Sequence, residues 1–389
     1  MGDIGLPFIP SSKSLAMSLQ RKKRKESDHP SIPHDWDDMK IPEDMKCTAD
    51  GQNFCIMEER MPGKDQKIWG FASQMGIEVM KTATDWFIDG TFELVNSTLF
   101  KQLWVVTCAI NETETTVPCA FYLLPCKEPS AYKMAFENLK SLGLEGPNTI
   151  HIDFESGEVI AARDVYPNSK IVCCDFHWKQ ALTNNISRCH LMKCYNEDMM
   201  MQKFVRYLWT LSLVPPDKVV DAWENFVCLE VPEAEEEGVE EEERMAALDL
   251  NASMDKFMTY FESTWIGSKK RGCQRKRPRY DISLWNKFDT ILEDGQTTNN
   301  RSEVWNCASK IGMSMHPSIW QLMDLFKKED AVMRAKLSSV ALRRESPDHP
   351  GRKQARSVCR EQLQKILRKW DSLSLKDYFN LVSAHYNYE

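Results

Sequence analysis

Three apolar runs in the first third of the chain carry the strongest β-strand pattern. WFIDGTFEL (86–94), KQLWVVTCAI (101–110) and TTVPCAFYLLP (115–125) are rich in β-branched and aromatic residues, and short polar segments separate them. Runs of this length joined by short turns pair with their sequence neighbours. The spacing therefore predicts an antiparallel meander of three strands.

Helical and strand patterns alternate after the meander. The segment SAYKMAFENLKSL has apolar residues at helical spacing, and a helix within EVIAARDVYP must stop by Pro167. The order β-β-β-α-β-α-β-α predicts an α/β fold with a mixed sheet and helices on both faces, which matches a ribonuclease-H-like fold. The predicted elements are a helix over 130–142, a strand over 148–154, a helix over 158–167, a strand over 170–176 and a helix from Trp178.

Five regions follow from the shifts in composition along the chain. A polar N-terminal segment is predicted to be disordered, and a strand or hairpin with a helix ending near Lys81 flanks the catalytic core. A large helical insertion interrupts that core, and QLMDLFKKEDAVMRAKLSSV has the spacing of an amphipathic helix. The expected bounds are 1–45, 46–84, 85–180 for the core, 181–290 for the insertion and 291–389 for a helical region that completes the core.

Composition narrows the class of protein. The 389 residues are 42% hydrophobic, which is enough for a packed interior. No stretch approaches 18 uninterrupted apolar residues, so we expect no membrane span, and the N-terminus lacks an apolar core of signal-peptide type. The thirteen cysteines are therefore expected to be reduced thiols or metal ligands in a reducing compartment.

Charge is unevenly distributed along the chain. The net charge is −7, and the acidic run PEAEEEGVEEEER (232–244) accounts for all of it. Basic clusters at 20–25 and 269–279 are typical of nuclear localisation signals or phosphate-contacting patches, although a solvated charged loop has the same composition. The candidate DNA-contacting residues are Lys269, Lys270, Arg271, Arg275, Lys276, Arg277 and Arg279.

Two carboxylates fall on predicted strands. Asp89 lies inside the first run, and Asp153 ends the fourth strand in HIDFESG. In a sheet of this order the first and fourth strands are neighbours, so the two acids should meet. Two adjacent carboxylates repel each other unless a cation binds both, and oxygen-only ligands favour Mg²⁺ or Mn²⁺. Alternatively, Asp89 and Gly90 form a tight turn and Asp153 caps the next helix.

A third acid would complete a two-metal site for phosphoryl transfer. Glu303, in GQTTNNRSEVWNCASK, begins a predicted helix that Asn299 or Asn300 could cap. A glutamate in a first helical turn also occurs without any ligand, because the helix dipole stabilises it there. Glu303 is the candidate third ligand.

Four segments in this order resemble one family. WFIDGTFEL, HIDFESG, CCDFHWKQAL and GQTTNNRSEVWN are similar to transposases of Mutator-like elements, which share the MULE transposase domain. The family pattern has an Asp in a DGTF-like strand, an Asp in a DFE-like strand end, a C-x-x-H before a helix and a last acid after TNN. The matching positions are Asp89, Asp153, Cys174 with His177, and Glu303.

The resemblance spans roughly residues 47–330 and implies a function. It implies DNA cleavage and strand transfer, with two Mg²⁺ or Mn²⁺ ions held by Asp89, Asp153 and Glu303, in a nuclear protein that acts as a homo-oligomer. Members often carry an N-terminal zinc finger of the FLYWCH kind. No such finger is found here, since Cys47 and Cys55 have no nearby histidine.

The C-x-x-H pair has two interpretations. Cys174 and His177 are two ligands, whereas structural zinc needs four, which Cys189, His190 and Cys194 could complete. The alternative, which we favour over zinc, is a packed thiol and a histidine that hydrogen-bonds near the acids. The family resemblance makes the pair a site without defining its role.

Two rival functions remain open. One is a catalytically inactive, host-used nuclear protein that binds DNA or chromatin partners; the lack of a recognisable finger and the acidic run favour it. The other is a ribonuclease-H-like nuclease acting on RNA or hybrids, which the long helical segment between Asp153 and Glu303 disfavours.

Overall fold

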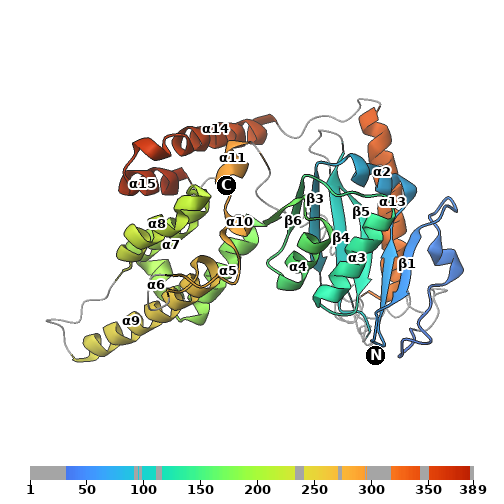
Figure 1. Cartoon of the computed structure of the whole chain (residues 1–389), viewed down its shortest axis with the longest axis horizontal. Helices are drawn as coiled ribbons and strands as arrows, with labels where there is room; N and C mark the ends of the chain where they lie inside the picture. The colour runs from blue at the N-terminus through green and yellow to red at the C-terminus, as the bar shows by residue number, and fades with distance from the viewer. Residues whose placement is uncertain are drawn as a thin grey trace, which may run out of the picture.

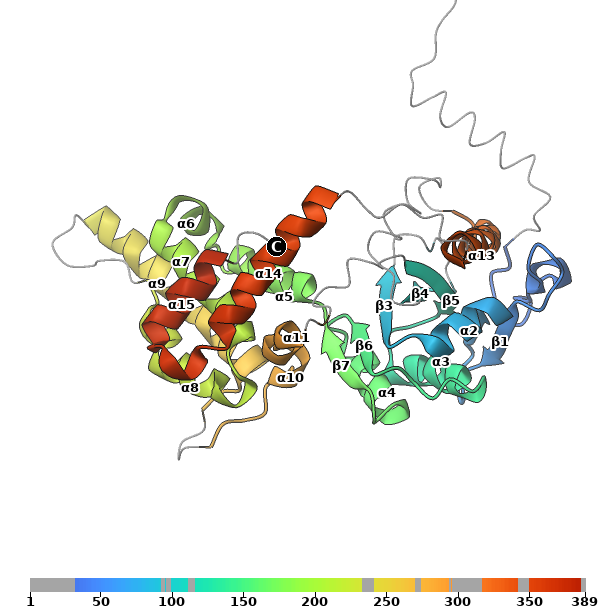
Figure 2. The same ribbon diagram turned by 90° about the horizontal axis from the view of Figure 1, so that it is seen from above.

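The computed structural model describes nine parts of the chain. They are residues 32–91, 95, 99–110, 116–232, 241–269, 274–293, 295, 317–341 and 350–385, with side chains except at 241–247, 341 and 350–357. Within these parts a mixed sheet with flanking helices forms one half of the molecule, and a helical region forms the other (Figure 1, Figure 2).

The sheet has seven strands in the order β1-β2-β5-β4-β3-β6-β7. All neighbours from β1 to β3 are antiparallel, while β3, β6 and β7 run parallel. The predicted α/β class with a mixed sheet is therefore confirmed. The strands are β1 (Cys55–Arg60), β2 (Lys67–Phe71), β3 (Asp85–Thr91), β4 (Gln102–Ala109), β5 (Thr116–Leu124), β6 (Thr149–Ile152) and β7 (Lys170–Cys173).

The predicted meander is β3-β4-β5, and the two later strands are β6 and β7. Both later strands end earlier than predicted, because the chain turns at Asp153 into one helix and at Cys174 into the next. The predicted N-terminal hairpin is β1-β2. It pairs with β5 and extends the sheet, with Gly70 of β2 opposite Tyr122.

One face of the sheet packs against α2 (Gln74–Thr82), α3 (Pro129–Ser141) and α4 (Ser156–Val165). Trp104 of β4 is fully buried on this face and meets the ring of Phe136 on α3 edge-on at 5.0 Å. Strand residues alternate between faces, so Trp86 and Ile88 of β3 join the same apolar cluster.

The opposite face is covered by α13 (Ile319–Ala341). Phe326 stacks on Phe121 of β5 at 4.5 Å, and Trp320 stacks on Trp69 of β2 at 6.2 Å. The amphipathic helix predicted from QLMDLFKKEDAVMRAKLSSV is confirmed. It closes a second core on the sheet.

The helical region begins with α5 (Asp175–Arg188). Trp178 of this helix stacks on Trp285 at 5.0 Å, and Trp265 packs edge-on against both. The other elements are η1 (Glu43–Lys46), α6 (Met192–Glu197), α7 (Met199–Thr210), η2 (Leu211–Leu213), η3 (Pro216–Lys218), α8 (Val219–Asn225), η4 (Val227–Leu229), α9 (Glu241–Phe261), the π-helix η5 (Glu262–Ile266), α10 (Ile282–Trp285), α11 (Phe288–Leu292), α14 (Pro350–Leu367), η6 (Trp370–Ser372) and α15 (Leu375–His385).

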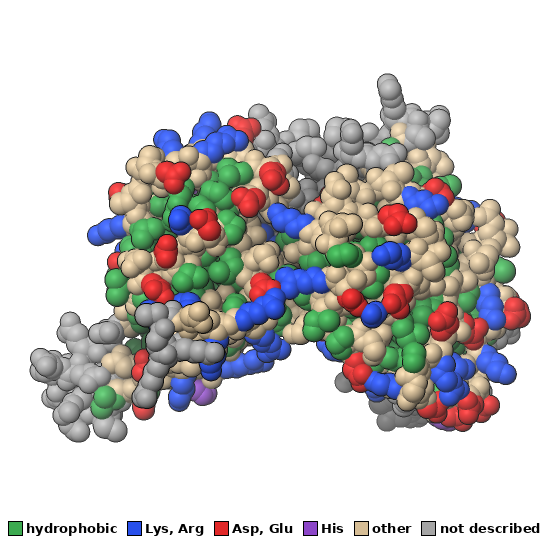
Figure 3. All heavy atoms as spheres, in the orientation of Figure 1, with side chains coloured by type: hydrophobic (Ala, Val, Ile, Leu, Met, Phe, Trp, Pro, Cys, Tyr) green, Lys and Arg blue, Asp and Glu red, His purple; other side chains and the backbone are tan. Residues whose placement is uncertain are grey.

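Polar contacts join the helical region to the carboxyl ends of the sheet. The buried Lys287 donates from Nζ to the carbonyl of Cys173, and burial lowers the pKa of this lysine. Arg163 of α4 donates to Asp281 at 2.9 Å. Figure 3 shows lysine and arginine side chains gathered along this junction. None of the described helices is both long and apolar enough to cross a bilayer.

Candidate functional site

Asp89 lies in the middle of the sheet. Its strand β3 pairs with β4 on one side and β6 on the other, and the carboxylate is 7% exposed. The preceding Trp86, Phe87 and Ile88 are strong strand formers, which keep Asp89 and Gly90 in the strand. The alternative prediction of a tight turn at Asp89 and Gly90 is therefore wrong.

The parallel pairing of β3 and β6 brings the second acid to the same edge of the sheet as the first. Phe87 of β3 is the partner of His151 of β6, and their rings stack at 4.5 Å. Asp89 lies two residues beyond this pair in β3, and Asp153 directly follows β6, so both acids lie at the carboxyl ends of neighbouring parallel strands. Asp153 does not cap α4, because Glu155 occupies that position. The predicted adjacency of the two acid-bearing strands is confirmed.

The C-x-x-H pair belongs to the same edge of the sheet. Ile152 of β6 is the partner of Cys173 of β7, so the next position sets Cys174 level with Asp153. Cys174 is the N-cap residue of α5, and its backbone nitrogen donates to Ile152 at 3.1 Å. Asp89 of β3, Asp153 after β6 and Cys174 after β7 thus form one row at the carboxyl ends of three neighbouring parallel strands.

His177 pairs with Asp153. Its Nδ1 lies 2.6 Å from Oδ1 of the carboxylate, and both side chains are about one quarter exposed, at 25% and 21%. Burial alone would lower the pKa of His177, but hydrogen bonds and charge interactions with Asp153 and Cys174 raise it to about 11. At neutral pH the imidazole is therefore a cation held against Asp153.

A further carboxyl group, which the sequence did not single out, lies behind this row. Glu158 of α4 is 2% exposed and accepts a hydrogen bond from Nε1 of Trp104 at 2.7 Å. Burial raises its pKa well above the usual range, and the charges of Asp153, Glu155 and Asp89 add to the rise while the Trp104 bond opposes it. The helical spacing of Glu158 with Ala162 and Val165 could have indicated a buried position.

A polar network packs against β3 beside Asp89. The hydroxyl of Tyr132 is 2.8 Å from Oε1 of Gln102 and also bonds to the Glu155 carboxylate. A Cβ atom at Gly90 would lie 1.8 Å from Nε2 of Gln102. Only glycine at position 90 allows Gln102 to approach the strand so closely.

The structure does not describe the third predicted ligand. Glu303 lies outside the described residues, as do Asn299 and Asn300. Among the residues that the structure describes, no group of three or more His, Cys, Asp or Glu side chains could hold a metal ion. The described part of the site thus contains Asp89 and Asp153, with His177 on the second acid.

The basic loop has buried and exposed members. Arg275 is 13% exposed and donates to Glu224 and Glu262, so it anchors the loop to α8 and η5. Arg277 is 75% exposed and pairs with Asp281 at 2.6 Å. The other described members are Lys269, which is 60% exposed and pairs with Glu224, and the exposed Lys276 and Arg279; Lys270 and Arg271 lie outside the described residues.

Comparison with known families agrees with the row of site residues. Residues 86–181 match the model of the MULE transposase domain, a span that holds Asp89, Asp153, Cys174 and His177. The resemblance seen in the sequence is confirmed over this span. No curated protein matches the chain. The match indicates a transposase or a transposase-derived protein, and a transposase domain implies interaction with DNA.

Proposed function

We propose that this chain is a MULE-type DNA transposase, or a protein derived from one, that cleaves DNA and transfers strands. Asp89, Asp153 and Glu303 would hold two Mg²⁺ or Mn²⁺ ions, and the protein would act as a homo-oligomer in the nucleus. The observation that carries the proposal is the parallel pairing of β3 with β6, which brings Asp89 and Asp153 to the carboxyl ends of adjacent strands. The order β5-β4-β3-β6-β7 supports a ribonuclease-H-like core.

The described side chains fit divalent cations in two respects. Their donors are carboxylate oxygens, which suit Mg²⁺ and Mn²⁺. Burial is the main cause of the raised pKa of Glu158, and the charges of Asp153, Glu155 and Asp89 add to it, so these acids lie within electrostatic range of one side chain. When bound, divalent ions would activate water or a 3′-hydroxyl and stabilise the leaving oxygen of the phosphodiester.

The chain's own residues would position these acids. His177 restrains the Asp153 carboxylate through its Nδ1 contact. Gln102 and Tyr132 pack against β3 at Gly90, the residue after Asp89. Both acids would therefore be oriented before DNA arrives, which reduces the free energy needed to organise the site.

A second candidate is a nuclear DNA- or chromatin-binding protein without cleavage activity. The ion pair of His177 with Asp153 favours it, because an imidazolium already supplies positive charge to that carboxylate. The two candidates differ in whether a metal binds between Asp89 and Asp153.

Cleavage of a labelled DNA duplex in Mn²⁺ tests the proposal. The wild-type chain should cleave, and Asp89→Asn and Asp153→Asn should each reduce the rate on the order of 100-fold or more. Asp217→Asn is the matched control, since Asp217 is 74% exposed on η3 in the helical region. Equal cleavage by all four proteins would refute the proposal, and no cleavage by any would favour the second candidate.

A further inference from the structure

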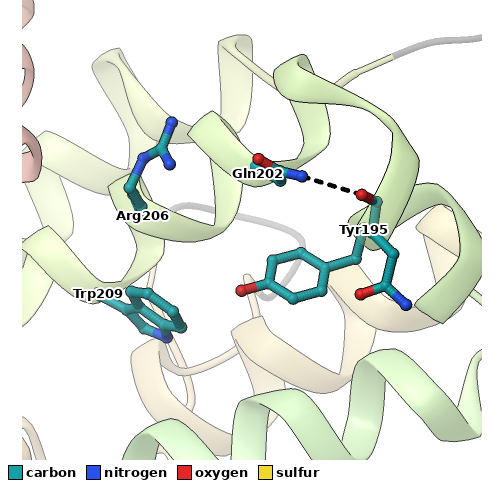
Figure 4. A pocket seen from close by; sticks show the side chains of 5 residues that line it. Tyr195, Gln202, Arg206 and Trp209 are labelled. Atoms are coloured by element: carbon teal, nitrogen blue, oxygen red, sulfur yellow. Dashed lines mark hydrogen bonds between the residues drawn. The ribbon is translucent and has the colours of Figure 1, made fainter. Parts of the chain in front are cut away.

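A cavity in the helical region is lined by aromatic and polar side chains that play no part in the acid site. It has a volume of about 220 Å³ and is lined by Tyr195, Asn196, Gln202, Arg206 and Trp209. The first two residues belong to α6, and the other three lie on one face of α7 at spacings of four and three residues. Figure 4 shows the rings of Tyr195 and Trp209 on two sides of the hollow, with Arg206 and Gln202 along another.

The lining combines aromatic area with hydrogen-bonding groups. Tyr195 and Trp209 are half-buried against the core, so their rings are held in place with part of their surface open. Gln202 donates from Nε2 to the carbonyl of Asn196 at 3.2 Å, which fixes its amide at the rim. Aromatic faces with amides and a guanidinium are the groups that proteins use to hold unpaired nucleobases.

Two cationic side chains lie at the cavity. Lys179 of α5 places Nζ 5.9 Å from the ring centroid of Trp209 and is itself paired with Asp175, and Arg206 lines the cavity. The nearby Asp198 caps α7, where it accepts from the nitrogen of Met200 at 2.8 Å. Arg206 is therefore the charged group of the lining that can contact a phosphate.

Helix α5 connects the cavity to the acid row. Lys179 also pairs with Asp175 at 2.8 Å, and Asp175 is the residue after Cys174, the third member of the row. One lysine side chain thus contacts both the first turn of α5 and the ring of Trp209. Four residues of helix span about 6 Å. The cavity is thus linked to the start of α5, beside Cys174, through one helical turn and one lysine side chain.

We propose that this cavity binds an unpaired nucleobase of the DNA strand on which the acids act. The base would lie against the rings of Trp209 and Tyr195, and Arg206 would lie near the phosphate of that nucleotide. The DNA substrate in this inference rests on the proposed function. A base inside a duplex is stacked and paired, so the cavity selects single-stranded or locally opened DNA. Inorganic phosphate or an anionic peptide would use Arg206 but not the two rings.

Binding of single-stranded oligonucleotides to the full chain tests this inference. The probes are a fluorescent oligodeoxythymidylate and an abasic oligonucleotide of equal length and charge, with EDTA present to prevent cleavage. The wild-type protein should bind the base-bearing probe more tightly. Trp209→Ala should weaken that binding about 5- to 100-fold and leave the abasic probe unchanged. Trp209→Phe should retain most of the affinity, because it keeps an aromatic face.

Two further variants make the result decisive. Leu229→Ala is the matched control, because Leu229 is 74% exposed in the same helical region and lies outside the cavity lining. If Trp209→Ala unfolds, Arg206→Gln provides the second test and should weaken binding of the base-bearing probe. The inference would be overturned if the wild-type protein bound both probes with equal affinity. It would also be overturned if a folded Trp209→Ala protein bound each probe as tightly as the wild type does.

The binding test is separable from the cleavage test. Asp89→Asn should keep the preference for the base-bearing probe, since Asp89 does not line the cavity. If Mn²⁺-dependent cleavage is lost while that preference remains, the result concerns the proposed function and leaves the cavity inference unaffected. Cleavage by a wild-type protein without any base preference would sink the cavity inference alone.

Discussion

Nδ1 of His177 lies 2.6 Å from Oδ1 of Asp153. This contact ties the first turn of α5 to the residue that follows β6. Because β6 pairs in parallel with β3, which carries Asp89, the contact connects the C-x-x-H motif to the sheet edge that holds both acids of the proposed site. The motif is therefore linked to Asp153 by a direct contact of its histidine.

Replacing His177 by alanine should make protein stability respond differently to pH. The pKa of His177 is raised to about 11 in the folded chain, above the ordinary value of 6.5 for histidine. The imidazolium therefore stabilises the fold fully below about pH 6.5, and this contribution disappears as pH rises through 11. Urea unfolding in EDTA should show His177→Ala less stable by about 1–3 kcal/mol at pH 6 and closer to wild type at pH 10. A stability difference that does not change with pH would contradict the ion pair.

Glu158→Gln should change the pH dependence in the same sense, but in a lower pH range. The folded-state pKa of Glu158 is raised by burial and neighbouring acids, so the folded chain keeps a proton that the unfolded chain releases. Wild-type stability should therefore fall relative to the variant as pH rises above about 4.3. Thermal unfolding of both proteins at pH 4 and pH 7 measures the difference. Parallel stability curves would show that Glu158 is not buried as described.

Gly90→Ala should destabilise the chain through Gln102. The new methyl group would lie 1.8 Å from Nε2 of Gln102, so that side chain must move and break its bond with Tyr132. We expect a loss of about 1–3 kcal/mol in the free energy of unfolding. Adding Gln102→Ala removes the clash, so the double variant should lose less than the sum of the single losses. Strict additivity would mean that Gly90 and Gln102 are not in contact.

The exposed and buried arginines of the basic loop should behave differently. Arg275→Ala breaks two ion pairs at a 13% exposed side chain and should lower stability by about 1–3 kcal/mol. Replacing Lys276, Arg277 and Arg279 by alanine should leave stability within about 0.5 kcal/mol. If the three contact DNA, their loss should reduce the dependence of log affinity on log salt by about 1 to 3. An unchanged salt dependence would exclude them as phosphate contacts.

The sequence predicted where the strands lie better than it predicted which strands pair with each other. The apolar runs located β3, β4 and β5, and the acid at the end of HIDF pointed to the edge where β3 and β6 meet. Periodicity carries no information on pairing partners, so it could not show that β1-β2 extends the sheet beside β5. Periodicity also predicted the helix α13, but it did not predict which face of the sheet Phe326 and Trp320 of this helix cover.

The candidate site was predicted only in part, because the pattern of the sequence shows strand order but not side-chain contacts. Asp89 and Asp153 follow from strand order, because parallel neighbours align residues at their carboxyl ends. The His177 contact depends on where α5 begins, and the predicted start near Trp178 was three residues late. Glu158 was missed because a carboxylate on a buried helix face violates the apolar pattern, and only the neighbouring Trp104 makes that position tolerable.

A crystal of the full chain soaked in Mn²⁺, with anomalous diffraction measured at the manganese edge, shows whether the two acids bind metal. We expect manganese between Asp89 and Asp153, with Glu303 completing the ligands, and loss of that signal in Asp89→Asn. Crystals in which Asp89 and Asp153 bind no manganese at saturating concentration, while Asp153 remains paired with His177, would refute a metal site at these acids.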